Sequence, residues 1–462
     1  MTKNMTTAPF SRPVRLNRGP HRPMRPTTGC TTITHWTREQ AGSIKATAAN
    51  TFPEFDNADV KTLVPDMDIW DTWLVLDEYG NVADVCGFTV LMALGQPLDR
   101  SYASKVVYFY SKDDEHYVYG GHMFPERLVA GAEEWSGCTI LRRDGLLQTF
   151  YTLTDGRTVN GMWESNQRIA TAIQDVTLCI DTDTNEDALV LEAPLAHNII
   201  LQPDGQLYQT PAQSNEMEAK NPNQHNRSAG NDQPNNCCFR DPKFFRDPAS
   251  GIAYLLFEAN TGSAICPEAK VQSNYVSRNP KVASKYKATI DALKANGCVG
   301  IAVFRDRQFR RAQFLPPIMT TNLVTDEIER INVIFREGSY YLYFVSHTNK
   351  MAVDGEDMIN RDLLLGFRSR SLTGPYTPLN GNGVVIQQKS PGGMYQGQET
   401  NPQYVYSWLV LPDDTVLSYA NFATTPQGEV KKIRTAGPTA TLDIRGSHSK
   451  ITGLIYDIQP AD

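Results

Sequence analysis

Acidic and tryptophan side chains alternate in one short stretch, just before an apolar pattern typical of a β-strand. The stretch contains Asp66, Asp68, Trp70, Asp71 and Trp73. Indole rings stack on the C–H faces of sugars, and a carboxylate either accepts hydrogen bonds from sugar hydroxyls or attacks an anomeric carbon. Taken alone, the stretch fits a solvated acidic turn with buried tryptophans better than a sugar site. Its interpretation therefore depends on other stretches.

The tripeptide Arg-Asp-Pro occurs twice, as Arg240–Pro242 and as Arg246–Pro248. In each copy, proline fixes the backbone φ angle beside a charged pair. The second copy precedes Ala249–Gly251, a pattern that predicts a plain hairpin turn into the next strand. We therefore expect Asp241 in the first copy to be the functional aspartate.

Two glutamates, Glu327 and Glu329, are separated by one residue. In a strand they would face the same side, and their repulsion together with partial burial would raise the pKa of one of them. A raised pKa suits a general acid that works near neutral pH. The alternative is an exposed acidic strand edge that Arg330 balances.

These three stretches place acids at the starts of three separate groups of predicted strands. Retaining glycoside chemistry needs a carboxylate nucleophile and a second carboxyl group that first donates and then removes a proton. A third acid that binds sugar hydroxyls can stabilise the oxocarbenium-like transition state. The pattern supplies all three groups.

The elements that must position these acids are short strands. The chain has 462 residues, of which 10% are aromatic and 32 are glycines, a composition that favours a β-rich, turn-rich enzyme. Many short strands at even spacing indicate an all-β sandwich, barrel or propeller. The predicted strands cover residues 88–94, 105–110, 117–119, 146–153, 172–180, 252–258, 299–304, 331–335, 340–345, 363–368, 404–411, 415–422 and 441–444.

Helical and irregular segments are few. The capping-box spacing of Thr37 and Gln40 predicts a short helix that runs towards Ala49. The Asn-, Gln- and Ser-rich residues 211–236 predict a long surface loop, and a helical pattern covers Val282–Ala295.

The domain organisation expected from the sequence is simple. Residues 1–30 are polar and rich in Pro and Arg, without the apolar core of a secretory signal, and they predict a flexible N-terminal arm. A basic binding tail is the alternative interpretation of this arm. Neither of the two segments that interrupt the strand pattern marks a boundary, so we expect residues 31–462 to form a single domain.

Charge and cysteine content exclude several classes of protein. The net charge of −7 is spread along the chain, with no basic stripe for nucleic acid and no apolar run long enough to span a bilayer. The eight cysteines show no zinc-binding spacing. Cys237, Cys238, Cys266 and Cys298 lie in or near polar segments, where a disulfide could form, but the pairing stays open.

The motifs resemble glycoside hydrolase family 68, the family of levansucrases, inulosucrases and β-fructofuranosidases. The resemblance covers roughly residues 35–458, and the motifs occur in the order expected for the family. The matching segments are Trp36–Arg38, Trp70–Trp73, Tyr108–Ser111, Val118–Gly121, Glu134–Gly137, Phe239–Pro242, Phe257–Thr261 and Asp326–Arg330.

The resemblance implies an all-β, five-bladed β-propeller with a central funnel-shaped active-site pocket and a few peripheral helices. It implies that Asp71 is the nucleophile, that Asp241 stabilises the transition state, and that Glu329 is the general acid/base. The residues implied to bind substrate are Trp70, Trp135, Ser136, Arg240, Glu327, His347 and Tyr419.

The implied activity is that of a retaining, sucrose-cleaving fructosyltransferase of levansucrase type, which passes fructose to a sugar or fructan acceptor or to water. The alternatives are a β-fructofuranosidase that mainly hydrolyses sucrose, or an enzyme that makes short fructooligosaccharides or inulin. A sugar-binding propeller that has lost turnover is a further alternative, although the intact acids argue against it. At the position of His347 some family members carry Arg and others His, near the acceptor side. The alternative for His347 is a loop histidine without a role.

The expected partners are sucrose and saccharide or fructan acceptors, with no nucleic acid and no membrane. The calcium-site loop of some family members is not recognisable after Thr261, so we expect no metal and no cofactor. Sucrose and polymer chemistry suit the outside of the cell. We therefore expect an extracellular protein without a recognisable signal peptide.

Overall fold

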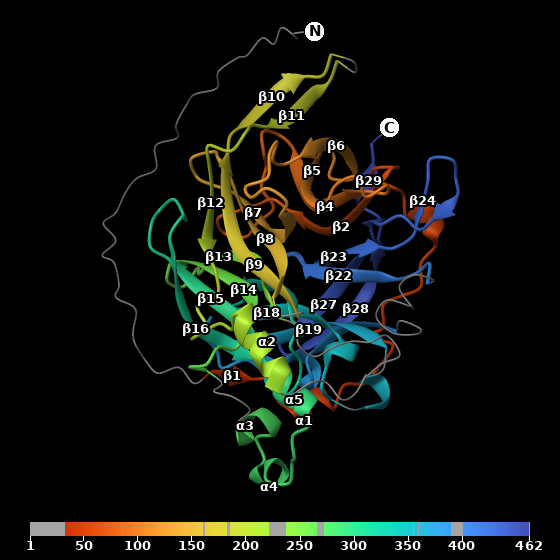
Figure 1. Cartoon of the computed structure of the whole chain (residues 1–462). Coiled ribbons are helices and arrows are strands. Elements are labelled where there is room, and N and C mark those ends of the chain that lie inside the picture. The colour runs from red at the N-terminus through yellow and green to blue at the C-terminus, as the bar shows by residue number, and fades with distance from the viewer. Residues whose placement is uncertain are drawn as a thin grey trace.

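The computed structural model describes residues 33–461, apart from residues 160–161, 183–184, 221–236, 266–271, 354, 359 and 390–400. Five five-stranded sheets are arranged as the blades of a propeller (Figure 1). The prediction of an all-β, five-bladed propeller is confirmed. The arm expected over residues 1–30 lies outside the described residues, and the single domain over residues 31–462 stays a prediction.

The first three blades follow one another along the chain. The first comprises β2 (Met67–Leu74), β4 (Thr89–Pro97), β5 (Lys105–Ser111), β6 (His116–His122) and β29 (Gln459–Pro460). The second comprises β3 (Leu76–Asp77), β7 (Glu133–Leu141), β8 (Leu147–Val159), β9 (Met162–Gln174) and β12 (Ala196–Leu201). The third comprises β13 (Phe239–Arg246), β14 (Ala253–Asn260), β15 (Gly297–Phe304), β16 (Ala312–Thr320) and β1 (Thr34–His35).

The last two blades complete the circle. The fourth comprises β17 (Glu329–Arg336), β18 (Ser339–His347), β19 (Arg361–Ser369), β20 (Thr377–Pro378) and β21 (Val384–Lys389). The fifth comprises β22 (Val405–Val410), β23 (Thr415–Ala420), β26 (Thr435–Ala436), β27 (Thr439–Arg445) and β28 (His448–Ile455). Two small hairpins are added, β10 (Val176–Ile180) with β11 (Asp187–Leu191) and β24 (Ala423–Thr424) with β25 (Val430–Lys431). The first hairpin projects from one end of the molecule (Figure 1).

The innermost strands of the blades, β2, β7, β13, β17 and β22, form a closed ring in which each contacts the next. Strand β29 helps to close the circle, because it follows the fifth blade in the chain and pairs in parallel with β6 of the first. Strand β1 pairs in parallel with β16 at the edge of the third blade. Side chains on these five innermost strands therefore meet at the propeller axis.

Apolar side chains fill the spaces between neighbouring blades. Every residue of β15 and of β18 is buried, because each strand has a blade packed on both of its faces. This explains their nearly continuous apolar and aromatic sequences. Full burial of one such side chain, for example Leu342, stabilises the fold by roughly 1.5–3 kcal/mol. The blades thus hold the ring of innermost strands rigidly.

The helices lie at the periphery and correct three sequence-based expectations. The capping box at Thr37 is present, but α1 covers only Arg38–Ala41 and ends at Gly42 rather than near Ala49. Residues 211–220, expected in a loop, form the helix α2 (Pro211–Lys220), while the rest of that segment lies outside the described residues. The pattern expected to form one helix near Val282–Ala295 is divided between two short helices.

The remaining helices are short. They are α3 (Ser273–Val276), α4 (Pro280–Ala283), α5 (Ile290–Lys294) and the 3₁₀ turns η1 (Asn57–Asp59), η2 (Thr348–Lys350), η3 (Glu356–Met358) and η4 (Leu379–Gly381). Helices α1, α3, α4 and α5 gather at the end opposite the β10–β11 hairpin (Figure 1). In the part of the chain that the structure describes, the helices are too short and too polar to cross a bilayer. No disulfide joins the six described cysteines, and Cys30 and Cys266 lie outside the described residues.

Candidate active site

Each innermost strand contains one irregularity where its pairing with the next strand shifts in register. A β-bulge of this kind bends the strand and re-aims its side chains. The shifts lie between Trp70 and Trp73, Trp135 and Gly137, Arg240 and Lys243, Glu329 and Asn332, and Tyr406 and Leu409. Most of the residues that the sequence analysis selected therefore lie at or beside these bulges.

Four of the bulges contain a non-glycine residue in the left-handed backbone region. Their φ angles are 51° at Asp71, 55° at Asp241, 58° at Arg330 and 61° at Ser407. Such a conformation costs of order 1–3 kcal/mol per residue and persists only where the surroundings hold it. In this protein the strained residues lie on the innermost strands, whose side chains converge at the propeller axis.

Asp241 lies at the floor of the site, where it is 7% exposed. Its Oδ1 accepts a 2.8 Å hydrogen bond from the Ser136 hydroxyl, and its Oδ2 accepts one of 2.8 Å from the backbone amide of Arg330. Its own amide donates to the Thr152 hydroxyl. Burial, followed by the neighbouring charge of Asp71, raises the pKa of Asp241, although Arg240 acts in the opposite direction.

The axis beneath Asp241 is almost filled. The cavity there has a volume of about 10 Å³, and Trp73, Asp241, Lys243, Arg330 and Leu409 are among its lining residues. A volume of this size accommodates about one water molecule. A ligand therefore reaches Asp241 only from the opposite side of the ring.

Asp71 is only partly buried. The Arg330 guanidinium fixes the backbone at this position, because it donates to the carbonyl oxygens of Asp71 (3.2 Å) and Thr72 (2.5 Å). The adjacent Trp70 is also half-buried, and the guanidinium of Arg434 lies 4.5 Å from the centre of an indole ring. A carboxylate beside a partly exposed indole suits a bound sugar.

Glu329 is held by two donors on neighbouring blades. Nη2 of Arg240 lies 3.0 Å from its Oε1, and the Tyr406 hydroxyl donates a 2.6 Å hydrogen bond to its Oε2. The side chain remains 22% exposed, which lets a ligand reach it. Burial, and next the charge of Glu327, raise the pKa of Glu329 to about 8. The raised pKa favours the protonated form of Glu329, which is the form a general acid needs.

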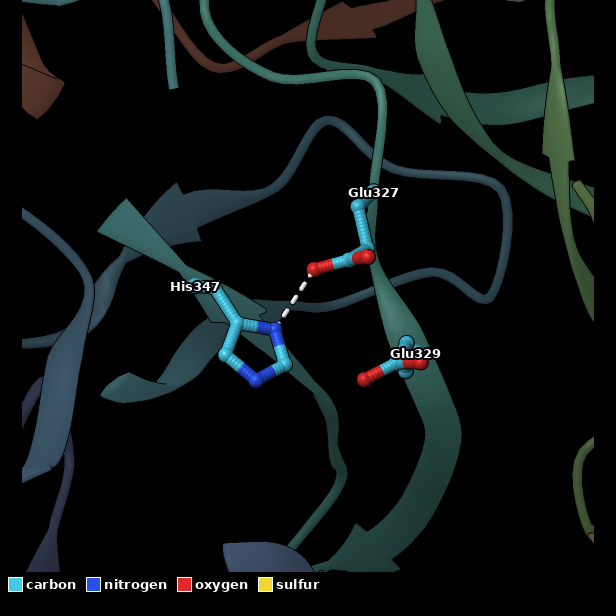
Figure 2. A group of neighbouring side chains, drawn as sticks. All are labelled: Glu327, Glu329 and His347. Atoms are coloured by element: carbon cyan, nitrogen blue, oxygen red, sulfur yellow. Dashed lines mark hydrogen bonds and ion pairs between the residues drawn. The ribbon is translucent and has the colours of Figure 1, made fainter. Parts of the chain in front are cut away.

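Glu327, in contrast, is favoured in its ionised form. Figure 2 shows that Glu327, Glu329 and His347 converge, and that Nδ1 of His347 contacts Oε1 of Glu327, at 2.7 Å. Burial acts to raise the pKa of Glu327, but the His347 charge and hydrogen bond outweigh burial and lower it to about 2. The expectation that repulsion in this pair raises one pKa therefore holds, and Glu329 is the residue concerned.

Arg240 supplies the positive charge at the centre of this group. Its Nε donates a 2.6 Å hydrogen bond to Glu258, which is fully buried, and its Nη2 lies 3.8 Å from Glu327. The guanidinium also lies 5.9 Å from the Trp135 ring, within the range of a cation–π contact. The side chain is therefore fixed by a buried ion pair on one side and an aromatic ring on another.

Glu327, Glu329 and His347 could also be considered as ligands of a metal ion. Ligand atoms of Glu327, Glu329 and His347 all lie within 4.8 Å of one another, a spacing that could hold a metal ion. However, the Arg240 guanidinium already contacts Glu329 and lies near Glu327, and a second cation there would be repelled. The positively charged His347 would have to lose its proton as well. We therefore assign no metal to this cluster.

A family model described as Levansucrase/Invertase matches residues 27–457 of the chain. The chain belongs to glycoside hydrolase family 68. A levansucrase from Rahnella aquatilis is 28% identical over 445 residues, which cover 90% of this chain and 94% of that protein. An extracellular sucrase from Zymomonas mobilis is 28% identical over 434 residues, which cover 91% of this chain and 93% of that protein.

Solved structures of family 68 enzymes share the fold. A variant levansucrase from Bacillus megaterium has a TM-score of 0.77 and 25% identity, with 93% of this chain and 98% of that chain covered. An inulosucrase from Halalkalicoccus jeotgali, bound to kestose, has a TM-score of 0.68 and 28% identity, with 93% and 98% covered. The likeness extends over all five blades of this family 68 enzyme.

The structure brings most of the predicted site residues together. The three acids lie on β2, β13 and β17, and the remaining residues surround them. Those that contact an acid or its immediate partners are Trp135, Ser136, Arg240, Glu327 and His347, and Trp70 directly precedes Asp71 in β2. Tyr419 is different: it is buried, and its ring packs against Tyr406 at 6.4 Å. Tyr406, rather than Tyr419, contacts Glu329.

Three residues of this family 68 site were not found from the sequence. Tyr406 lies in an apolar run that predicts an ordinary core strand, and no nearby charge marks it. Arg330 was considered only as a charge that balances the two glutamates, whereas its guanidinium binds backbone carbonyls of β2. Glu258 lies in a matched motif, Phe257–Thr261, which was the one available signal for its ion pair with Arg240.

Proposed function

We propose that this family 68 enzyme is a retaining, sucrose-cleaving fructosyltransferase of levansucrase type. The observation that carries the proposal is that three acids lie on three innermost strands of one ring, and that the pKa of one of them, Glu329, is raised. Asp241 lies on β13, which neighbours the Glu329 strand β17 in the ring, whereas Asp71 lies on β2, which is separated from each of these strands by one other strand. Retaining transfer of a sugar needs a carboxylate nucleophile together with a carboxylic acid.

In the first step, the Asp71 carboxylate attacks the anomeric carbon of the fructosyl unit of sucrose. Glu329 donates its proton to the bridging oxygen, so glucose leaves and Asp71 carries fructose as an ester. In the second step, the Glu329 carboxylate removes a proton from an acceptor hydroxyl. That oxygen attacks the anomeric carbon from the face that glucose left and releases Asp71, which gives net retention.

Asp241 would stabilise the transition state by accepting hydrogen bonds from the fructosyl hydroxyls. The Ser136 hydroxyl and the Arg330 amide orient its two oxygens in advance, so little reorganisation is needed during the reaction. The fructosyl unit would lie deepest, because the axis is closed beneath Asp241. The residues that we propose to bind sucrose are Trp70, Trp135, Ser136, Arg240, Glu327, His347 and, more peripherally, Tyr419.

The relatives carry different names, and the acceptor of this chain is a separate part of the proposal. Their names include levansucrases, an extracellular sucrase and an inulosucrase bound to kestose. We propose a saccharide or growing fructan as the principal acceptor, with water in competition. A β-fructofuranosidase that mainly hydrolyses sucrose is the alternative. The extracellular sucrase relatives support an extracellular location, which also suits polymer synthesis.

Incubation of the protein with sucrose tests this proposal. Free glucose in clear excess over free fructose, with oligosaccharide or polymer products, is the outcome expected for a transferase. Equal amounts of the two sugars would show that the enzyme mainly hydrolyses sucrose and would support the alternative. Asp71→Ala should abolish glucose release. Undiminished release from that variant, or no release from the unmodified protein, would overturn the proposed mechanism.

A further inference from the structure

A second carboxylate lies on the far side of the His347 ring from Glu327. We propose that Asp362 is a positioning residue for the acid/base: it keeps His347 in the imidazolium form, which holds the negative charge on Glu327 and the proton on Glu329. This inference rests on the proposed function, since it concerns the proton that Glu329 would donate.

The geometry places His347 between two carboxylates. His347 ends β18, and Asp362 is its direct partner in the antiparallel pairing of β18 with β19. Nδ1 lies 2.7 Å from Oε1 of Glu327, and Nε2 lies 3.7 Å from Oδ1 of Asp362. Imidazolium has two N–H groups and can face a carboxylate with each, whereas a neutral ring has only one. The arrangement therefore favours the charged ring.

Asp362 is itself held in place. It is 2% exposed, and its Oδ2 accepts a 2.7 Å hydrogen bond from the Tyr404 hydroxyl, which leaves Oδ1 directed towards His347. Tyr404 immediately precedes β22, the innermost strand of the next blade. The orientation of the carboxylate is thus determined by the meeting of two blades, outside the space where sucrose would bind.

The charges around His347 support the same assignment. Burial acts to lower the pKa of His347, but Asp362 first and Glu327 second raise it, with a net value of about 9. The titratable and charged groups that face the ring or its carboxylate partners are Arg240 on β13, Glu327 before β17, Glu329 on β17, Lys350 in η2, Asp362 on β19, and Tyr404 and Tyr406 beside and on β22.

Loss of Asp362 would change how Glu327 and Glu329 share a proton. Without Asp362, burial would take His347 towards the neutral form near pH 7, and Glu327 would lose the charged partner that hydrogen-bonds to it, with Arg240 remaining 3.8 Å away. The imidazolium charge lowers the pKa of both glutamates, but its hydrogen bond goes to Glu327. Its loss would therefore let the proton of Glu329 be shared with Glu327, where it is useless for the leaving glucose. Asp362 thus acts through His347 on the protonation of Glu329 and does not touch the substrate.

The first test measures His347 directly, without turnover. NMR of protein labelled in its histidine rings follows the eight histidines through a pH titration, and the signal missing from His347→Gln identifies the ring. In Asp362→Asn the pKa of His347 should fall by about one to two units, because one carboxylate within ion-pair distance has been removed. An unchanged titration overturns the proposal, whether or not the protein cleaves sucrose.

The second test is the pH profile of kcat/KM for sucrose. In Asp362→Asn the upper limb should move to lower pH by about one unit, with activity at pH 5 within about threefold of the unmodified enzyme. The matched control is Asp357→Asn, whose carboxylate pairs with Arg361 away from the ring and should leave the profile unchanged. Equal loss at every pH would indicate a merely structural role and overturn the proposal.

A permanently charged residue at position 347 should remove the need for Asp362. In a His347→Arg background, Asp362→Asn should produce no shift of the upper limb, because guanidinium keeps its charge without the second carboxylate. A shift that persists in this background overturns the proposal. Absence of sucrose cleavage by the unmodified enzyme would instead remove the proposed function, while the NMR titration still decides the role of Asp362.

Discussion

The backbone amide of Arg330 donates a 2.8 Å hydrogen bond to Oδ2 of Asp241. The same residue follows Glu329 directly, and its guanidinium binds the carbonyl oxygens of Asp71 and Thr72. One residue therefore links the three strands that carry the proposed nucleophile, transition-state stabiliser and acid/base. Its left-handed backbone, with φ of 58°, allows the amide and the side chain to serve different neighbours.

Replacement of Arg330 by Met should remove the side-chain contacts between β17 and β2. Asp71 would lose the contacts that fix its backbone, and a displacement of about 1 Å at a reacting group costs on the order of 10²-fold in rate. We expect kcat/KM for sucrose to fall by about that factor. The control is Arg336→Met on the same strand, whose guanidinium pairs with Asp414 outside the site. Activity of Arg330→Met within threefold of the unmodified enzyme would contradict the linking role.

Tyr406→Phe should move the upper limb of the pH profile to higher pH. The general acid Glu329 must be protonated, so kcat/KM falls as pH rises through its pKa of about 8. The Tyr406 hydroxyl donates to the Glu329 carboxylate and favours its ionised form, so removal of the donor raises that pKa further. We expect an upward shift of about one unit, since one hydrogen bond to a charged group is worth about 1.5–3 kcal/mol.

The control for that variant is Tyr341→Phe, whose hydroxyl donates to the Gly446 carbonyl away from the acids. It should keep the profile of the unmodified enzyme. A downward shift in Tyr406→Phe would mean that the hydroxyl stabilises the protonated acid instead.

Glu327→Gln should have the opposite effect. The negative charge of Glu327 is the second cause, after burial, of the raised pKa of Glu329. When that charge is removed, the pKa of Glu329 falls, and the upper limb of kcat/KM moves to lower pH by about one unit. Opposite shifts in the Glu327 and Tyr406 variants, measured in the same buffers, would show that both report on one group. Shifts in the same direction would assign the limb to another residue.

Much of the fold follows from local sequence patterns. The apolar runs over residues 299–304 and 340–345 predict strands because both of their faces are buried between blades. The Asn, Gln and Ser content of residues 211–220 favours a loop and obscures the start signal of the helix α2. That signal is a capping box in which Thr210 and Gln213 bond to each other's backbone amides.

The site was predictable only in part, for a physical reason. Acids and tryptophans carry their chemistry in their residue types, so Asp71, Asp241 and Glu329 stand out in the sequence. Tyr406 acquires its role because the fifth blade meets the fourth, which brings it to Glu329 across 77 residues of chain. The bulge that turns the Arg330 amide towards Asp241 likewise depends on the closed ring of strands. Neither relationship leaves a local pattern in the sequence.

Gly137→Ala should damage both the fold and the site. Gly137 follows Ser136 at the bulge of β7, where a Cβ would lie 1.9 Å from the Phe150 carbonyl oxygen and 2.7 Å from the Tyr151 Cα. Both neighbours are backbone of the paired strand β8 and cannot rotate away. We expect the free energy of unfolding to fall by at least about 3 kcal/mol, the upper range for an overpacked core.

Loss of activity should accompany this destabilisation, because the Ser136 hydroxyl that orients Asp241 is carried by the same bulge. The control is Gly453→Ala in β28, where an added Cβ meets only Thr441 Oγ1, at 3.6 Å, an ordinary contact. Denaturant unfolding of the two variants gives the comparison, and Gly453→Ala should differ from the unmodified protein by less than about 1 kcal/mol. If Gly137→Ala is as stable as the unmodified protein, an added Cβ is tolerated between β7 and β8. The close approach of these strands would then not be what positions Ser136 beside Asp241.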